Sequence, residues 1–485
     1  MKGAVWTRIH SSRHGYFSIG ALAIATLFGS SAGCRSESLQ TALARAYYAN
    51  PDLNQSRSKV RAQDEEAPKA LAGMRPKASI GANVGGLYGN LNLPFGQTGQ
   101  PGMGNGNING FGASYVGKPR GATLNVSQTL FDGGATTNNV RRAESGVFAA
   151  RASMRLTEQA ILQNGATAYM NVLRDTAVLN LRKNNIGVLE QQLKLTQDRF
   201  DIGEVTRTDV AQAQSSLAQA KTEFYAAQAQ LKNSVANYRQ IIGDEPDKLE
   251  PARSLEPLLP HTLDEAIEVA IVEHPGVKAA IHQVDAAEMA VKVAEAALAP
   301  NFSINAQVSN NYDNFNGLPG SRAFLAGTSA QLNIPLYQGG SEYASIRQAK
   351  EQLGQARLNM DLQRDSVRAS VVSSYGLLDT AKSSIISSMA AVKAAEIALA
   401  GTRAEAKVGQ RTTLDVLNAQ QALLNARVSL VSAQRDRVVA SYAALGSIGR
   451  LSANEINLDV QVYDVDRHYN QVKSKWIGVD TPGEK

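Results

Sequence analysis

The sequence predicts a mainly α-helical protein with a small β part, built from two tandem repeats. The first observation is a turn that occurs twice. "IGEVTRTDVAQAQ" (202–214) returns 206 residues later as "VGQRTTLDVLNAQ" (408–420), with six of thirteen positions identical. The second is that each copy lies in a long Ala- and Gln-rich tract, which favours closely packed helices over a thick globular core. The third is a pair of short alternating segments at matching positions in each half.

The repeat extends well beyond this turn. "LFDGG" (130–134) matches "LYQGG" (336–340) at the offset of 206, whereas Asn50-Pro51 matches His274-Pro275 at an offset of 224. The first copy therefore carries an insertion of 18 residues, and its Gly/Asn-rich segment (85–112) is predicted to be a loop. The resulting division is a first repeat (34–243), a Pro-rich linker (244–261), a second repeat (262–449) and a tail (450–485), equatorial or disordered, without a counterpart.

The N-terminus has the pattern of a secretory signal. Lys2, Arg8 and Arg13 precede an apolar stretch (17–28) that is too short to span a membrane, and small residues follow it. We therefore exclude residues 1–33 from the fold, which lowers the net charge from +6 to +3. That balance, without a cluster of basic and aromatic residues, gives no reason to expect a nucleic acid partner.

Cys34 is the only cysteine, so a disulfide within the chain is impossible. Its position after "SSAG" fits a lipoprotein cleavage site, where it would be acylated. Ser31, however, stands where such a site prefers Leu. Lipidation of Cys34 and a thiol without function both stay open.

Each repeat is predicted to begin with a helix and two strands. The helices (39–74 and 263–299) are ended by Pro76 and Pro300. The strands are 77–88 and 121–131 in the first copy and 301–312 and 327–337 in the second. Leu124, Val126 and Leu130 alternate with polar residues, which is typical of a strand with one wet face.

A Gly-Gly pair then switches each strand to a long helix. The first such helix (135–201) has no proline over 67 residues, about 100 Å at 1.5 Å per residue. The returning helix (206–242) and the first helix are each about half as long, so the two stacked end to end would match the long one.

No segment after the signal is apolar enough for a transmembrane helix, so any part that enters a membrane must be made of strands. Four strands cannot close a barrel, and lipid forbids open edges. Several protomers must then combine. Two chains would supply eight strands and three would supply twelve.

Nothing indicates an enzyme, a metal site or a cofactor. No Ser-His-Asp set is present, and the four histidines beyond the signal (His261, His274, His282, His468) lack metal-ligand spacing. The acidic run Asp64-Glu65-Glu66 is expected to be a solvated helix face.

The duplicated order of helix, strand pair, long helix and returning helix, with "LFDGG"/"LYQGG" and "RFDIGEVTRTDV"/"VGQRTTLDV", resembles the TolC family of outer-membrane efflux and secretion ducts. The resemblance covers about residues 38–450. It implies a homotrimer in the outer membrane of a Gram-negative bacterium, with a twelve-stranded β-barrel continuous with a long periplasmic α-helical barrel. It also implies a periplasmic adaptor (a membrane fusion protein) and an inner-membrane transporter of ABC or RND type as partners.

In this resemblance each copy of the turn is a tip at the periplasmic end of the duct. Gly203 and Gly409 would adopt the left-handed conformation that ends the long helix. Thr206 or Thr208, and Thr412 or Thr413, would cap the returning helix, with Asp209 and Asp415 near its positive end. The same residues could equally do no more than form a good turn.

The resemblance also assigns a pore entrance. Asp415 would contribute to a ring of carboxylates that makes the duct cation-preferring, and Asn418 stands where the family prototype has a second such ring. Arg411 matches an arginine that locks the closed entrance by bonding near the Asp209 position of a neighbouring tip. Ala406 stands where the prototype has a reinforcing tyrosine, so the lock should be looser here.

The tips are further expected to meet the adaptor. Two tips per chain in a trimer would give a quasi-six-fold rim, which suits a hexameric adaptor, and the alternative is a solvated turn without a partner. The residues involved are Gly203, Glu204, Val205, Thr206, Gly409, Gln410, Arg411 and Thr412.

The competing function is that of a periplasmic coiled-coil structural or adaptor protein, anchored to lipid through Cys34 or not at all. It accounts for the helices but leaves the two matching strand pairs unexplained. A passive duct takes its substrate from the transporter, so drug efflux and protein secretion both stay open.

Overall fold

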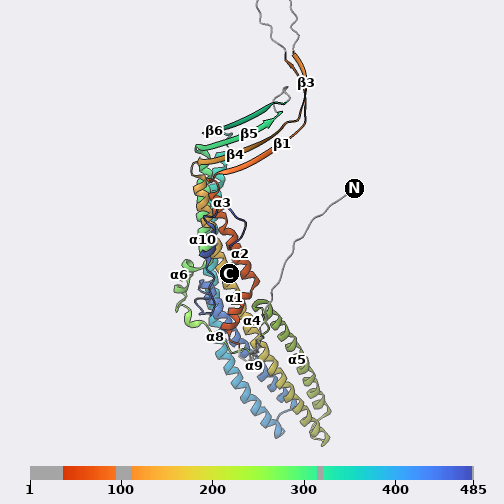
Figure 1. The fold of residues 1–485 in the computed structure, drawn as a ribbon. Coiled ribbons are helices and arrows are strands. Elements are labelled where there is room, and N and C mark those ends of the chain that lie inside the picture. Colours follow the sequence, from red (N-terminus) through yellow and green to blue (C-terminus); the bar gives the residue numbers. More distant parts are fainter. Residues whose placement is uncertain (1–36, 94–110, 314–319, 483–485) are drawn as a thin grey trace, which may run out of the picture.

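The computed structural model describes residues 37–93, 111–313 and 320–482. The molecule is elongated, with a small sheet at one end and two helical hairpins at the other (Figure 1). The predicted signal (1–33) and Cys34 lie outside the described residues.

Two pairs of helices make up most of the length. The long helices α4 (Ala135–Asp201) and α8 (Ser341–Lys407) have 67 residues each, and the returning helices α5 (Arg207–Ile242) and α9 (Thr413–Ile448) have 36 each. The helix α5 packs along one half of α4, and the helices before the first strand pack along the other half (Figure 1). The predicted end-to-end match to the long helix is therefore confirmed.

The prediction of one continuous helix before each strand pair is wrong. The first is broken into α1 (Leu39–Ala49), α2 (Pro51–Asp64) and α3 (Glu66–Leu71). The second is broken into α6 (Leu263–Glu273), α7 (Pro275–Glu295) and a 3₁₀ turn η2 (Ala296–Leu298). A residue before proline is pushed out of the helical region, and Asn50 and His274 have ψ of 123° and 126°. Each then caps the next helix: Asn50 Oδ1 accepts from the Asp52 N–H and His274 Nδ1 from the Gly276 N–H.

The main sheet joins the two halves of the chain. Its order is β1 (Lys77–Val84), β4 (Arg120–Phe131), β5 (Asn301–Tyr312) and β6 (Arg322–Asn333), all antiparallel. The last strand begins earlier than predicted, and it ends at Asn333 because Pro335 cannot donate to a ladder. In the described chain, β1 and β6 form the two edges of the sheet, and both are exposed along their whole length.

A further hairpin, which the sequence analysis treated as part of a loop, extends beyond the sheet. The strand β2 (Leu87–Leu93) pairs with β3 (Phe111–Gly117), and the Gly85 N–H donates to the Pro119 carbonyl oxygen at 2.8 Å, continuing from the β1–β4 pair. The prediction of a loop for the whole of 85–112 is therefore wrong. Leucines and a glycine alternate with one tyrosine and two asparagines along "LYGNLNL", a strand pattern that the high Gly and Asn content concealed.

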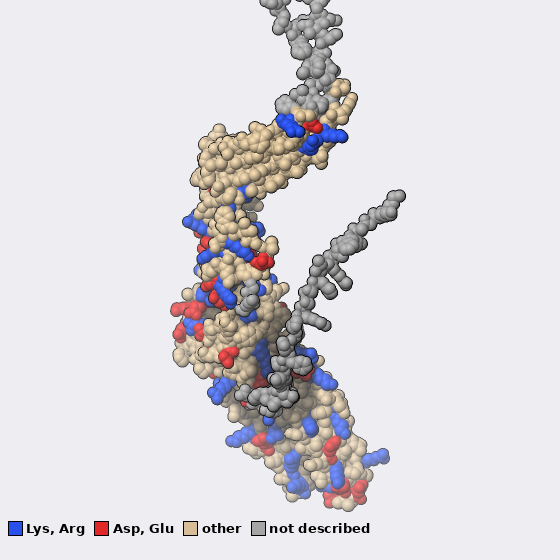
Figure 2. Space-filling view, in the orientation of Figure 1, with Lys and Arg blue, Asp and Glu red and all other residues tan. Residues whose placement is uncertain are grey.

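Charged residues stand only at the ends of the four main strands. Lys77 begins β1, whereas Arg120 and Arg322 lie at the far end, and the sequences between them contain no Lys, Arg, Asp or Glu. Figure 2 shows this uncharged band with blue and red atoms gathered at its outer end. Both arginines flank Tyr312 in the strand register, each guanidinium 5.4 Å from the centre of its ring. A 12-residue strand is about 40 Å long, so tilted by about 45° it matches a hydrocarbon layer of roughly 30 Å.

The densest core lies at mid-height, where the linker crosses the helices. Tyr169, Tyr238 and Tyr442 are buried there. The Tyr169 hydroxyl donates to the Glu250 carbonyl oxygen at 2.7 Å, and the Tyr375 hydroxyl donates to the Pro260 carbonyl oxygen at 3.3 Å. One tyrosine from each long helix therefore bonds to a backbone carbonyl of the linker.

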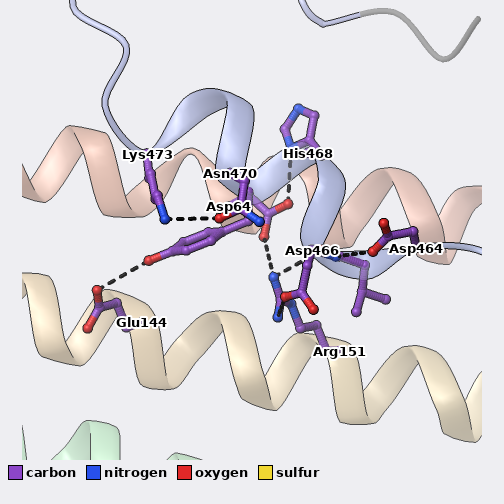
Figure 3. A network of polar contacts seen from close by, with 10 residues as sticks. Asp64, Glu144, Arg151, Asp464, Asp466, His468, Asn470 and Lys473 are labelled. Atoms are coloured by element: carbon purple, nitrogen blue, oxygen red, sulfur yellow. Dashed lines mark hydrogen bonds and ion pairs between the residues drawn. The ribbon is translucent and has the colours of Figure 1, made fainter.

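The tail forms a short helix, α10 (Val465–Val472), on α2 and α4 (Figure 3). His468 Nδ1 lies 3.0 Å from Asp64 Oδ2, and Arg151 pairs with Asp466 at 2.6 Å. Asp64 is fully buried, so its prediction as a solvated residue is wrong. Burial raises the pKa of the Asp64 carboxyl, while the bond to His468 and the charge of Arg151 oppose that rise.

One helix of the described residues, α8, is long and apolar enough to cross a membrane by length and composition. The expectation that no such segment exists is wrong by this criterion. Only 6% of the apolar window is buried in the single chain, and alanines are frequent in α8. An exposed face of this kind on a long helix fits packing against another helix, since small residues allow close approach.

Candidate functional site: the two helical tips

The first tip is the turn between α4 and α5. The Glu204 N–H donates to the Arg199 carbonyl oxygen at 2.9 Å, closing the last turn of α4, and Gly203 has φ of +83°. A side chain at Gly203 would meet nothing within 4 Å, so the backbone conformation, and not space, requires glycine here. The predicted left-handed glycine is confirmed.

The second tip, between α8 and α9, has the same backbone. The Gln410 N–H donates to the Glu405 carbonyl oxygen at 3.0 Å, and Gly409 has φ of +80°. Gly409 likewise has open space around it. The two turns therefore end their long helices by the same device.

Both returning helices begin with a capping box. The Asp209 N–H donates to Thr206 Oγ1 at 3.3 Å, and the Thr206 N–H donates back to Asp209 Oδ2 at 2.9 Å. Of the two threonines considered for this cap, Thr206 is the one that forms it, and Thr208 lies inside α5. The box satisfies N–H groups that would otherwise lack partners at the start of a helix.

The second tip repeats the arrangement with Thr412 and Asp415. The Asp415 N–H donates to Thr412 Oγ1 at 3.2 Å, and the Thr412 N–H donates to Asp415 Oδ2 at 3.0 Å. The Thr412 hydroxyl also donates to Oδ2, at 2.9 Å. The two bonds that the Asp415 carboxylate accepts both end on Oδ2, which leaves Oδ1 as an acceptor for a cation. Thr413 lies inside α9 and is not the cap.

These bonds keep both carboxyls ionised. The hydrogen bond from the Thr206 hydroxyl lowers the pKa of Asp209 below its ordinary value, and the Thr412 backbone N–H, followed by its hydroxyl, lowers the pKa of Asp415. In the single chain these bonds favour the ionised form of Asp415, which is the form that a ring attracting cations would need.

Each tip also carries one ion pair, and the two pairs are reversed. In the first tip, Arg199 on α4 lies 2.9 Å from Glu204 in the turn. In the second tip, Glu405 on α8 lies 2.9 Å from Arg411 in the turn. Arg199 and Glu405 occupy the same position of the repeat. Neither helix-end partner was predicted from the sequence, although each stands five or six residues before a residue of opposite charge.

The predicted lock residues do not meet within one chain. Arg411 pairs with Glu405, and this bond raises the pKa of the Arg411 guanidinium. Asp209 accepts a hydrogen bond from Thr206 in its own tip. The lock was predicted between neighbouring protomers, so it stays a prediction. Asn418 lies one turn beyond Asp415 on α9 and is exposed.

The two helical hairpins also contact each other, away from their turns. The Gln420 side chain on α9 donates to Asn185 Oδ1 on α4 at 3.3 Å, and Arg403 on α8 donates to Gln420 Oε1 at 2.9 Å. Leu189 and Leu417 pack together beside this contact. These contacts therefore join the second hairpin to α4 well before the end of that helix.

Within the described residues, no group of three His, Cys, Asp or Glu side chains could hold a metal ion.

Comparison with known proteins identifies the family. Residues 39–244 and 266–449 match the outer membrane efflux protein family. The chain belongs to this family. Its members are channel proteins of the Gram-negative outer membrane that extend into the periplasm, and this chain shares that location. The resemblance to the TolC family is thereby confirmed.

Two relatives and one solved structure show how far the similarity extends. The outer membrane efflux protein BepC of Brucella suis is 39% identical and is covered over 93% of its length by 92% of this chain. The outer membrane protein TolC of Escherichia coli is 24% identical over 89% of this chain and 86% of its own. The Campylobacter jejuni CmeC outer membrane channel shares the fold, with a TM-score of 0.71 and 16% identity over 96% of this chain and 98% of that one.

Proposed function

We propose that the protein is the outer-membrane duct of a tripartite efflux pump or type I secretion system. Three copies would close one twelve-stranded barrel in the membrane and one helical barrel in the periplasm. The duct would conduct small molecules or proteins passively from a docked adaptor and transporter of ABC or RND type, without catalysis. The equal lengths of α4 and α8, and of α5 and α9, support an origin by tandem duplication.

The observation that carries this proposal is the sheet. Its middle is free of charge, its length fits a bilayer, and its edge strands β1 and β6 are exposed. An open edge in lipid would leave backbone N–H and C=O groups without partners, so the edges must pair with other copies. A periplasmic coiled coil has no need of such a sheet, and the family match favours the duct over that alternative.

Cysteine pairs across the open edges test the closure. In a Cys34→Ser background, Ala78→Cys on β1 is combined in turn with Ala326→Cys, Thr328→Cys or Ala330→Cys on β6. At least one pair should give disulfide-linked species that stop at three copies on a non-reducing gel, whereas each single cysteine should give none beyond a dimer. A ladder that continues past three copies, or no linkage at any register, contradicts the trimer.

Docking is tested at the tips. A photoreactive group placed at Glu204 or Gln410 should link to the adaptor, while the same group at Gln219, exposed on the side of α5, should not. Equal linkage at all three positions, or linkage at neither tip, would exclude specific docking through the turns.

A further inference from the structure

The segment that follows α10 carries apolar side chains without cover. Trp476 is 67% exposed, Ile477 91% and Val479 98%. Single exposed apolar residues are common on protein surfaces, but three within four positions form a patch that water solvates poorly.

This segment is fixed at the base of the sheet. Arg75 Nη1 donates to the Lys475 carbonyl oxygen at 2.8 Å, and the Arg75 guanidinium lies 4.7 Å from the centre of the Trp476 ring. Arg75 stands two residues before Lys77, the first residue of β1. Trp476 is therefore held close to the level at which the strands begin.

The rest of the tail is anchored firmly enough to maintain that position. Figure 3 shows α10 joined to α2 through His468 and Asp64 and to α4 through Asp466 and Arg151. The Tyr469 hydroxyl donates to Glu144 Oε1 at 3.2 Å, further along α4. Trp476 lies four residues after the end of α10, so the contacts of α10 limit where Trp476 can lie.

The surroundings of this patch match a membrane interface. Leu336 and Tyr337, which follow β6 at the opposite edge of the sheet and also lie where strands meet helices, are 89% and 76% exposed. Trp and Tyr are enriched where a bilayer meets water. Four basic residues lie in or beside the patch, and cations near the surface attract anionic lipids: Arg75, Lys77, Lys473 and Lys475.

We propose that Trp476, Ile477 and Val479 insert into the periplasmic leaflet of the outer membrane as an interfacial anchor. The basic residues beside them face the anionic phospholipid headgroups. The anchor ties the tail, and through α10 the helices α2 and α4, to the membrane at the foot of the barrel. This proposal rests on the proposed function, in which the sheet lies in the membrane.

Tryptophan fluorescence tests this directly. The chain has two tryptophans, Trp6 in the predicted signal and Trp476, so Trp6→Phe leaves one fluorophore even if the signal is retained. The full chain is reconstituted in vesicles of zwitterionic lipid with phosphatidylglycerol. Emission from Trp476 should be blue-shifted and should lose intensity with lipids brominated near the headgroup. It should lose less with lipids brominated at the chain ends, and little with iodide in the water.

Two outcomes would overturn the anchor. Strong quenching by iodide without quenching by brominated lipid would place Trp476 in water. A blue-shifted emission insensitive to both quenchers would bury it against protein, such as a neighbouring copy of the chain.

Two variants and one parallel measurement sharpen the test. Arg75→Ala removes the guanidinium that holds the ring and should shift quenching from brominated lipid towards iodide. Ile477→Ser with Val479→Ser leaves the strands and Arg75 intact and should do the same. Ion flux through the same vesicles reports the duct separately. Ion flux without lipid quenching refutes the anchor alone. If ion flux and lipid quenching are both absent, the duct and the anchor are refuted together.

Discussion

The two tips of this chain have the same backbone and opposite ion pairs. In the first, the cation Arg199 stands at the end of the long helix and the anion Glu204 in the turn, whereas in the second Glu405 stands on the helix and Arg411 in the turn. The C-terminal end of a helix carries partial negative charge, so Arg199 is favourable there with or without its partner. Glu405 is unfavourable there unless Arg411 accompanies it.

This difference predicts that the tips respond unequally to the same change. The first tip should keep its structure when its ion pair is removed, and the second should not. In a trimer the second tip would also supply the constriction, so the less self-sufficient turn would lie at the entrance that must open.

The largest effect is expected from Arg411→Ser. It leaves Glu405 unpaired at a negative helix end and removes the proposed bond to a neighbouring Asp209, so the resting single-channel conductance should rise severalfold. The matched change in the first tip, Glu204→Ser, leaves the helix-end Arg199 in place and should leave the conductance close to the wild-type value. Equal conductance in the two variants would refute both the lock and the inequality of the tips.

A charge reversal separates the two roles of Arg411. Glu405→Arg with Arg411→Glu recreates the ion pair in the direction found in the first tip. The turn should regain its protection from proteases, but conductance should stay raised, because a glutamate cannot bond the neighbour's Asp209. Recovery of the wild-type conductance would show that Arg411 acts only within its own tip.

Loss of either cap should have a smaller effect that is alike in both tips. Thr206→Ala and Thr412→Ala each remove a capping box worth about 1 kcal/mol, which speeds amide hydrogen exchange in the adjacent helix turn roughly fivefold. Hydrogen exchange with mass spectrometry can resolve the two turns, and Thr208→Ala and Thr413→Ala serve as controls that should change little. A threefold or greater difference between the two caps would contradict their equivalence.

The smallest effect is expected from acid. The pKa of both aspartates lies below the ordinary 3.8, so the capping boxes contribute their full stability above about pH 4 and lose it as the pH falls through the lowered values. Pepsin, active in acid, should therefore cut the tips faster as the pH drops in this range. Asp209→Asn and Asp415→Asn should remove that dependence at their own tip, and an unchanged dependence in both would rule out these carboxyls as its cause.

Local signals in the sequence predicted the long helices well. The helix over Ala135–Asp201 was predicted to the residue, because a Gly-Gly pair begins it, Gly203 ends it and proline is absent between them. The turn chemistry of both tips followed from Gly, Thr and Asp at fixed spacing. The breaks at Asn50 and His274 were missed, although the proline that follows each one is visible in the sequence.

Contacts between distant residues could not be predicted in this way. Asp64 belongs to a helix with a polar sequence, and its distant partners His468, 404 residues away, and Arg151 explain its burial. The charged residues of the two tips can be read from the sequence. Their pairing could not be predicted, because it depends on the fold of the turn, which brings the charged atoms of each pair to 2.9 Å.

The most direct test of a duct with its constriction at the second tip is ion selectivity in a planar bilayer. The wild type is compared with Asp415→Ala and with Asp209→Ala, which removes the same capping box from the first tip. The account predicts discrete, cation-selective openings whose selectivity falls in Asp415→Ala and persists in Asp209→Ala. Selectivity that survives Asp415→Ala, or a protein that forms no openings, would contradict it.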